Sequence, residues 1–187
     1  RICMSKINLP NRLTILRMLM VPLFIACFFL DRWLSWWNWL AAAVFFVADM
    51  TDVLDGYLAR SKGLVTNFGK LMDPMADKLL FCSAFILLTW QNKLSPIFCI
   101  IFIGRELIIS GFRLVTAAGG TIIAANKLGK IKAALQVIGI IAMLLNNPIF
   151  SMWNIPFDQI VMWLAAIFTV WSAMDYIIRN RKAVSWE

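Results

Sequence analysis

Six apolar stretches separated by short polar segments fill almost all of the 187-residue chain, and they constrain its fold more than any other feature. Each has roughly the 20 residues with which an α-helix crosses the hydrocarbon core of a bilayer. The stretches cover residues 12–30, 35–58, 72–91, 95–118, 128–147 and 157–178. They predict an all-α integral membrane protein with six transmembrane helices. We expect a single domain over residues 1–187, opening with a short juxtamembrane surface segment at residues 1–11.

The composition agrees with a membrane protein. Hydrophobic residues make up 61% of the chain and charged residues 15%, whereas soluble domains carry about 25% charged residues. A disordered chain, a collagen-like fibre and a water-soluble enzyme are thereby excluded. Residues 1–30 resemble a signal peptide, but their apolar part is too long and five further stretches follow, so we expect no cleavage there.

The charged residues are unevenly distributed along the chain. Lys and Arg number 18 against 10 Asp and Glu, a net charge of +8, and there is no histidine. In so apolar a chain this excess favours the anionic cytoplasmic leaflet as its partner, and no nucleic acid. With six spans, every basic residue except Arg32, Lys93 and Arg105 lies on or near one side of the membrane. The positive-inside rule therefore predicts that both termini are cytoplasmic.

Four aspartates form the most informative cluster in the sequence. Asp52 and Asp55 are three residues apart at the end of the second stretch, and Asp73 and Asp77 are four apart at the start of the third. Both spacings place a pair on one helical face. Because the two stretches are joined by a short connection, we expect antiparallel neighbours on which the four carboxylates converge.

Converging carboxylates repel one another unless cations neutralise them. Oxygen ligands without imidazole favour hard divalent ions, and four carboxylates suit two of them, Mg²⁺ or alternatively Mn²⁺. The competing interpretation is salt bridging to nearby basic residues, namely Arg60, Lys62, Lys70 and Lys78. Gly56 and Gly69 favour the metal site, because glycine within a helix is unfavourable unless a ligand approaches the backbone closely.

The cluster belongs to a longer motif that resembles the signature of the CDP-alcohol phosphotransferases, D-x-x-D-G-x-x-A-R-x8-G-x-x-x-D-x-x-x-D. Its positions here are Asp52, Asp55, Gly56, Ala59, Arg60, Gly69, Asp73 and Asp77. The resemblance implies that the first three aspartates hold two metals, and that Asp77 completes the site and acts as general base. It implies that Gly56, Ala59 and Gly69 leave room for the cytidine nucleotide, which Arg60 helps to position. It also implies a homodimer with a cytoplasmic active site, in a membrane that is most often bacterial.

Two further groups of residues resemble the phosphatidylglycerophosphate synthase branch of that family. In the first, near the N-terminus, the resemblance places Asn11, Thr14 and Arg17 beside the diphosphate. The second runs from Gly104 to Gln136. The resemblance implies transfer of the phosphatidyl group from CDP-diacylglycerol to sn-glycerol 3-phosphate, giving phosphatidylglycerol phosphate and CMP.

The positions of the cations support a phosphorylated acceptor independently. Arg105, deep in an apolar stretch, shares a helical face with Arg113, whereas its neighbour Glu106 is not expected to face it. Lys130 and Lys132 open the next stretch from the same side. Cations grouped in this way are typical of a pocket that binds a phosphate dianion.

Three alternatives remain open. They are a family member that uses inositol phosphate, an ion or proton transporter, and an inactive scaffold. Asp49 has no settled role, and we expect Asp175 to form a hydrogen bond within the helix bundle without a catalytic role.

Overall fold

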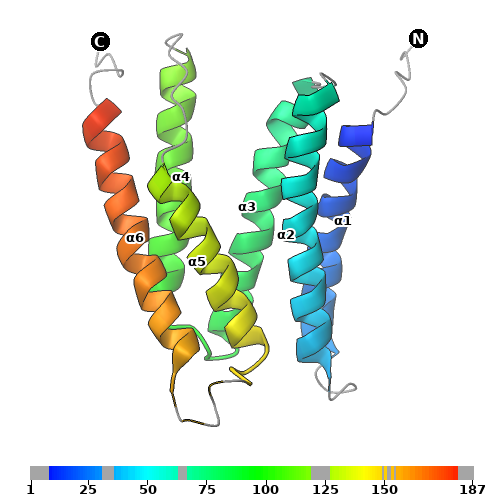
Figure 1. Ribbon diagram of the computed structural model, residues 1–187, viewed down its shortest axis with the longest axis vertical. Helices are drawn as coiled ribbons and strands as arrows, with labels where there is room; N and C mark the ends of the chain where they lie inside the picture. Colours follow the sequence, from blue (N-terminus) through cyan, green and yellow to red (C-terminus); the bar gives the residue numbers. More distant parts are fainter. Residues whose placement is uncertain are drawn as a thin grey trace. The chain divides into compact units, whose positions relative to one another are not determined.

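The computed structural model describes residues 9–30, 36–62, 67–118, 127–148, 150, 153 and 155–180. Over these residues the chain forms α-helices and no strand (Figure 1). The helices are α1 (Leu9–Phe29), α2 (Trp37–Lys62), α3 (Asn67–Trp90), α4 (Pro96–Ala118), α5 (Lys127–Leu144) and α6 (Phe157–Asn180). The predicted all-α fold is confirmed, with one helix at each of the six apolar stretches.

The helix ends differ from the predicted ends where polar residues continue or stop a helix. α2 runs on to Lys62, because charged residues that end an apolar stretch are still good helix formers, and α3 begins at Asn67, five residues before its apolar stretch. α5 ends three residues early, since Asn146 and Asn147 have positive φ angles of 58° and 53°. α1 begins at Leu9, so the last residues of the predicted juxtamembrane segment are helical, while residues 1–8 lie outside the described residues.

One helix in the described part of the chain, α6, is long and apolar enough to cross a membrane, with a mean hydropathy of 1.6 over its best window. Two shorter apolar segments, Met18–Phe29 in α1 and Lys78–Trp90 in α3, do not reach that length. The helical part of the prediction is therefore confirmed, and the six membrane crossings stay a prediction.

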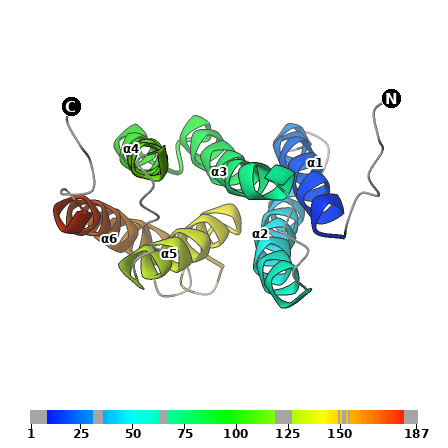
Figure 2. The same ribbon diagram turned by 90° about the horizontal axis from the view of Figure 1, so that it is seen from above.

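The chain divides into two compact units, residues 1–87 and 88–187. In the first, α1 packs along α2 through an aromatic core (Figures 1 and 2). The ring of Phe24 in α1 lies 5.7 Å from that of Phe45 in α2, and Phe45 lies 5.5 Å from Phe81 in α3. Phe45 is fully buried, so this one side chain ties together the helices that carry the aspartate motif.

In the second unit, α6 is the central helix and packs against both α5 and α4. Gly139 lets α5 approach α6 closely, because a Cβ at this position would lie 2.6 Å from Sδ of Met162. On the other side of α6, the ring of Trp163 meets that of Phe98 in α4 at 4.8 Å. α6 therefore holds α4 and α5 together and places their polar residues near its own.

Candidate active site

The four motif aspartates lie on two helices that contact each other within the first unit. Asp52 and Asp55 are on α2, and Asp73 and Asp77 are on α3. From the contact between Phe45 and Phe81, seven residues forward along α2 reach Asp52 and eight residues back along α3 reach Asp73. At about 1.5 Å per residue these are similar distances along antiparallel helices. The backbone therefore places both aspartate pairs at a similar level.

The donor set at this level fits divalent metal ions. The motif offers carboxylate oxygens, and the chain has no histidine to compete with them, so the ligands suit Mg²⁺ or Mn²⁺. The four carboxylate groups themselves lie outside the described side chains. Among the side chains that are described, none form a group of three or more potential metal ligands. The metal assignment stays a prediction.

The residues predicted to bind the nucleotide and its diphosphate also lie on the helices of the first unit. On α1 they are Asn11, Thr14 and Arg17, and on α2 and α3 they are Gly56, Ala59, Arg60 and Gly69. Their side chains lie outside those described, as does any space left by the two glycines. Asp49, one turn before Asp52, is half-buried and has a partner, so it is not a spare carboxylate.

The second unit contains a compact polar cluster in which one carboxylate joins two cations. Arg105 of α4 donates from Nη1 to Oε1 of Glu106 at 3.1 Å, and Lys132 of α5 donates from Nζ to the same oxygen. Lys132 is buried, with 5% of its surface exposed. Arg105 also donates from Nη2 to Oγ of Ser172 on α6 at 3.3 Å. The cluster therefore links α4, α5 and α6, and among its described groups two cations share one carboxylate.

The expectation that Arg105 does not pair with its neighbour Glu106 is wrong. Successive residues do point in directions about 100° apart on a helix, but an arginine side chain is long enough for its guanidinium group to bend back across that angle. Apolar surroundings favour this pairing, because an unpaired charge within an apolar helix is costly.

Arg113 lies two turns further along α4 and contacts the same helix as Arg105. Its Nε donates to the hydroxyl of Tyr176 at 3.3 Å, and its guanidinium carbon lies 5.3 Å from the centre of that ring. Both arginines therefore turn toward α6, as their spacing predicts. Lys130 does not join them: it is exposed on α5 and has no ion pair with any described residue. Its place beside an acceptor phosphate stays a prediction.

Sequence reasoning missed Ser172 and Tyr176 as partners of these arginines. They stand four residues apart in the last apolar stretch, and both are buried, with 1% and 3% of their surface exposed. Two polar residues on one face of a membrane-length helix are the signal that could have found them. Asp175, which was expected to form a hydrogen bond within the bundle, accepts one from Nε of Arg179 at 2.6 Å.

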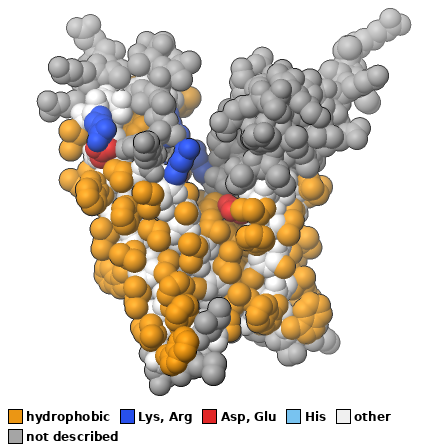
Figure 3. Space-filling view, viewed as in Figure 1, with side chains coloured by type: hydrophobic (Ala, Val, Ile, Leu, Met, Phe, Trp, Pro, Cys, Tyr) orange, Lys and Arg blue, Asp and Glu red, His pale blue; other side chains and the backbone are white. Residues whose placement is uncertain are grey.

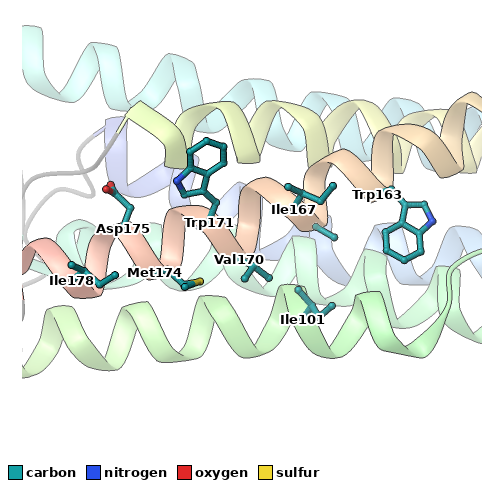
Figure 4. Close-up of a pocket in the computed structure, with 9 residues that line it drawn as sticks. Ile101, Trp163, Ile167, Val170, Trp171, Met174, Asp175 and Ile178 are labelled. Carbon is teal, nitrogen blue, oxygen red and sulfur yellow. The ribbon is translucent and has the colours of Figure 1, made fainter.

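A groove between α4 and α6 is apolar along almost its whole length (Figure 4). It encloses about 590 Å³, and its lining includes Ile101, Trp163, Ile167, Trp171 and Met174. Asp175 lies near one end of it (Figure 4). The groove contains none of the predicted acceptor residues, so the polar cluster, and not this groove, is the candidate site of the second unit.

The class of enzyme to which the aspartate motif belongs is identified by a family profile. The profile of the CDP-alcohol phosphatidyltransferase family matches residues 7–171, which is most of the chain. The chain therefore belongs to the CDP-alcohol phosphatidyltransferase family. The resemblance read from the motif is thereby confirmed, and so is the prediction of an enzyme of phospholipid biosynthesis.

Curated relatives match the chain over nearly its full length. A protein of Bacillus subtilis named CDP-diacylglycerol–glycerol-3-phosphate 3-phosphatidyltransferase is 40% identical, covering 95% of this chain and 97% of its own. Relatives of the same name from Rickettsia felis and Pseudomonas fluorescens are each 34% identical, covering 94% and 91% of this chain and 96% and 88% of their own.

Proposed function

We propose that the protein transfers the phosphatidyl group of CDP-diacylglycerol to sn-glycerol 3-phosphate, forming phosphatidylglycerol phosphate and releasing CMP. The relatives whose names state this reaction cover nearly the whole chain, which supports the donor and the acceptor together. The observation that carries the choice of acceptor is the grouping of Arg105, Arg113 and Lys132 on the helices of one unit, with Glu106 as the carboxylate between two of them.

The balance of charge in that unit favours a phosphorylated acceptor. Among the described side chains of this cluster, the cations Arg105, Lys132 and Arg113 outnumber the one carboxylate, Glu106, which suits a phosphate dianion. Serine or choline would bring no such group. The two arginines offer planar donor groups, which bind phosphate oxygens in pairs. We assign the acceptor phosphate to these residues, with Lys130 at the exposed edge.

The donor substrate is assigned to the first unit. Asp52, Asp55, Asp73 and Asp77 would hold two divalent cations, most simply Mg²⁺, which when bound neutralise the diphosphate and the charge developing on phosphorus. Asp77 would take the proton from the acceptor hydroxyl, whose oxygen then bonds to the phosphatidyl phosphorus as the bond to CMP breaks. Asn11, Thr14, Arg17 and Arg60 would orient the nucleotide diphosphate beside the small residues Gly56, Ala59 and Gly69.

We further propose that all six helices cross a bacterial cell membrane, with both termini and the active site on the cytoplasmic side. Large apolar side chains are exposed along the helices, as Figure 3 shows, and soluble proteins seldom expose so many together. Examples are Ile100 and Leu107 on α4 and Trp163, Ile167 and Trp171 on α6. A homodimeric state remains a prediction from the family resemblance.

The reaction is tested by measuring CMP release from CDP-diacylglycerol by the purified protein in detergent with Mg²⁺. Parallel reactions contain glycerol 3-phosphate, inositol 1-phosphate, serine or no acceptor. We expect release with glycerol 3-phosphate alone and its loss on adding EDTA. Release with inositol phosphate instead would overturn the acceptor assignment. The absence of CMP release with every acceptor, in folded protein, would overturn the transferase assignment and favour a transporter or a scaffold.

A further inference from the structure

The buried polar face of α6 contacts both arginines of the candidate acceptor site. Ser172 accepts from Nη2 of Arg105, and the Tyr176 hydroxyl accepts from Nε of Arg113, each at 3.3 Å. α4 and α6 run in the same direction, because the contacts of Phe98, Arg105 and Arg113 meet Trp163, Ser172 and Tyr176 in the same order. α6 is therefore a second scaffold for the arginines, independent of the helix on which they stand.

The spacing of these contacts favours a close approach of the two guanidinium groups. Arg105 and Arg113 are eight residues apart, about 12 Å along α4, which is too far for one phosphate if both side chains extend straight outward. Ser172 and Tyr176 are four residues apart, about 6 Å along α6. Because side chains on a helix tilt toward its N-terminus, the Tyr176 hydroxyl leans toward Ser172. The two anchoring residues on α6 are thus about half as far apart along their helix as the arginines are along α4.

Each arginine keeps donors available after these contacts. Arg113 is exposed, and Tyr176 engages only its Nε, so its two Nη groups stay accessible to a ligand. Nε of Arg105 is buried and has no partner within the described chain. Gln136, one turn beyond Lys132 on α5, is 3% exposed and its Nε2 is likewise unpartnered. Buried donors without acceptors are rare in folded proteins, and phosphate oxygens are acceptors of the kind they lack.

We propose that Tyr176, together with Ser172, is a positioning residue that sets the separation of Arg113 and Arg105 for one acceptor phosphate. This inference rests on the proposed function. It adds to the acceptor site two residues of α6, a helix that supplies no cation to that site. Neither residue touches the reacting atoms. Without the Tyr176 hydroxyl, the long side chain of Arg113 loses its anchor and binds phosphate from many conformations instead of one.

The test is the Tyr176→Phe variant, which removes one hydroxyl and keeps the ring that packs 5.8 Å from Phe112. Losing one hydrogen bond to a charged group corresponds to a rise of about tenfold in KM for glycerol 3-phosphate. We expect kcat and KM for CDP-diacylglycerol to stay within about twofold, since a positioning role on one substrate leaves the other unaffected.

The matched control is Thr169→Val on the same helix. Thr169 is fully buried, and its hydroxyl donates to the carbonyl of Ala165 in its own helix, not to an arginine. We expect this variant to leave KM for both substrates unchanged. A rise equal to that of Tyr176→Phe would overturn the proposal, because the loss of any buried hydroxyl from α6 would then have the same effect.

A double-mutant cycle separates positioning from general structural damage. If Tyr176 acts through Arg113, Tyr176→Phe has no further effect on KM for glycerol 3-phosphate once Arg113→Ala is present. Full additivity would overturn the proposal. Ser172→Ala, combined with Arg105→Ala, supplies the same test should Tyr176→Phe fail to give folded protein.

The outcomes distinguish this inference from the proposed function. If the wild-type protein releases no CMP in response to glycerol 3-phosphate, the proposed function fails and this inference fails with it. If the wild type responds and Arg113→Ala raises the KM, but Tyr176→Phe and Ser172→Ala do not, the function stands and the positioning role is wrong.

Discussion

The ammonium group of Lys132 on α5 donates a hydrogen bond to the carboxylate of Glu106 on α4. These two residues lie 26 positions apart in the chain, so the pair joins two helices. Arg105 donates to the same carboxylate oxygen. Lys132 and Arg105 would repel each other at this spacing without the anion between them. Glu106 therefore both holds α4 to α5 and keeps two cations in one place.

Removing Glu106 is expected to destabilise the protein. In Glu106→Ala, the buried Lys132 loses the carboxylate that it shares with Arg105, and breaking a buried pair in this way costs on the order of 3 kcal/mol. Thermal unfolding in detergent measures the loss. The control is Arg179→Ala, which removes a side chain that is 70% exposed from its pair with Asp175, and for which we expect a loss of less than about 1 kcal/mol. Equal losses of stability in both variants would show that the Glu106 pair stabilises the protein no more than an exposed ion pair does.

A second prediction concerns the contact between α5 and α6. In Gly139→Ala the new methyl group would lie 2.6 Å from Sδ and 3.2 Å from Cγ of Met162, which is fully buried, so this side chain has to shift. Overpacking of this kind costs about 1–3 kcal/mol. Gly111→Ala on α4 is the matched variant, because nothing lies within 4 Å of its new methyl group. We expect it to stabilise the helix by about 0.5–1 kcal/mol.

Thermal unfolding of the two glycine variants under the same conditions decides the matter. Their melting temperatures should move in opposite directions from that of the wild type. A fall in both melting temperatures would mean that alanine destabilises α4 and α5 for a reason other than the space around these two positions.

The helices could be predicted from the sequence because long apolar stretches with polar breaks determine where helices lie. The stops at Asn92 and at Asn146 coincide with residues that adopt positive φ, so local chemistry marked those ends as well. The continuation of α2 to Lys62 was missed, because hydropathy falls at charged residues although helix formation does not.

The polar cluster could be predicted only in part. Periodicity placed Arg105 and Arg113 on one face of α4, and both do turn to α6. It could not reveal that Glu106 bridges Arg105 to Lys132, because that depends on which helices pack together and on how long side chains bend. The partners Ser172 and Tyr176 were missed for the same reason, because the sequence does not show which helix packs against their face of α6.

The proposed membrane topology predicts opposite labelling of two positions at helix ends. Trp36, just before α2, is expected outside the cytoplasm, and Asn180, at the end of α6, is expected inside it. Cysteine is introduced at each in turn, in a chain whose four native cysteines have been replaced by alanine. In intact cells a membrane-impermeant maleimide should label Trp36→Cys and spare Asn180→Cys. Inverted vesicles should give the reverse, whereas equal labelling in both would rule out this topology.

The last prediction tests the aspartate motif as the chemical centre. Asp77→Asn keeps the size of the side chain but removes the base that accepts the hydroxyl proton, so kcat should fall by about 10²–10⁴-fold. Asp52→Asn weakens the proposed metal site, and its residual activity should require more Mg²⁺, which a titration of CMP release against Mg²⁺ measures. Asp158→Asn, in the first turn of α6, is the control and should behave as wild type. Near-normal turnover in Asp77→Asn would mean that another group takes the proton. An unchanged Mg²⁺ requirement in Asp52→Asn would mean that this carboxylate is not a ligand.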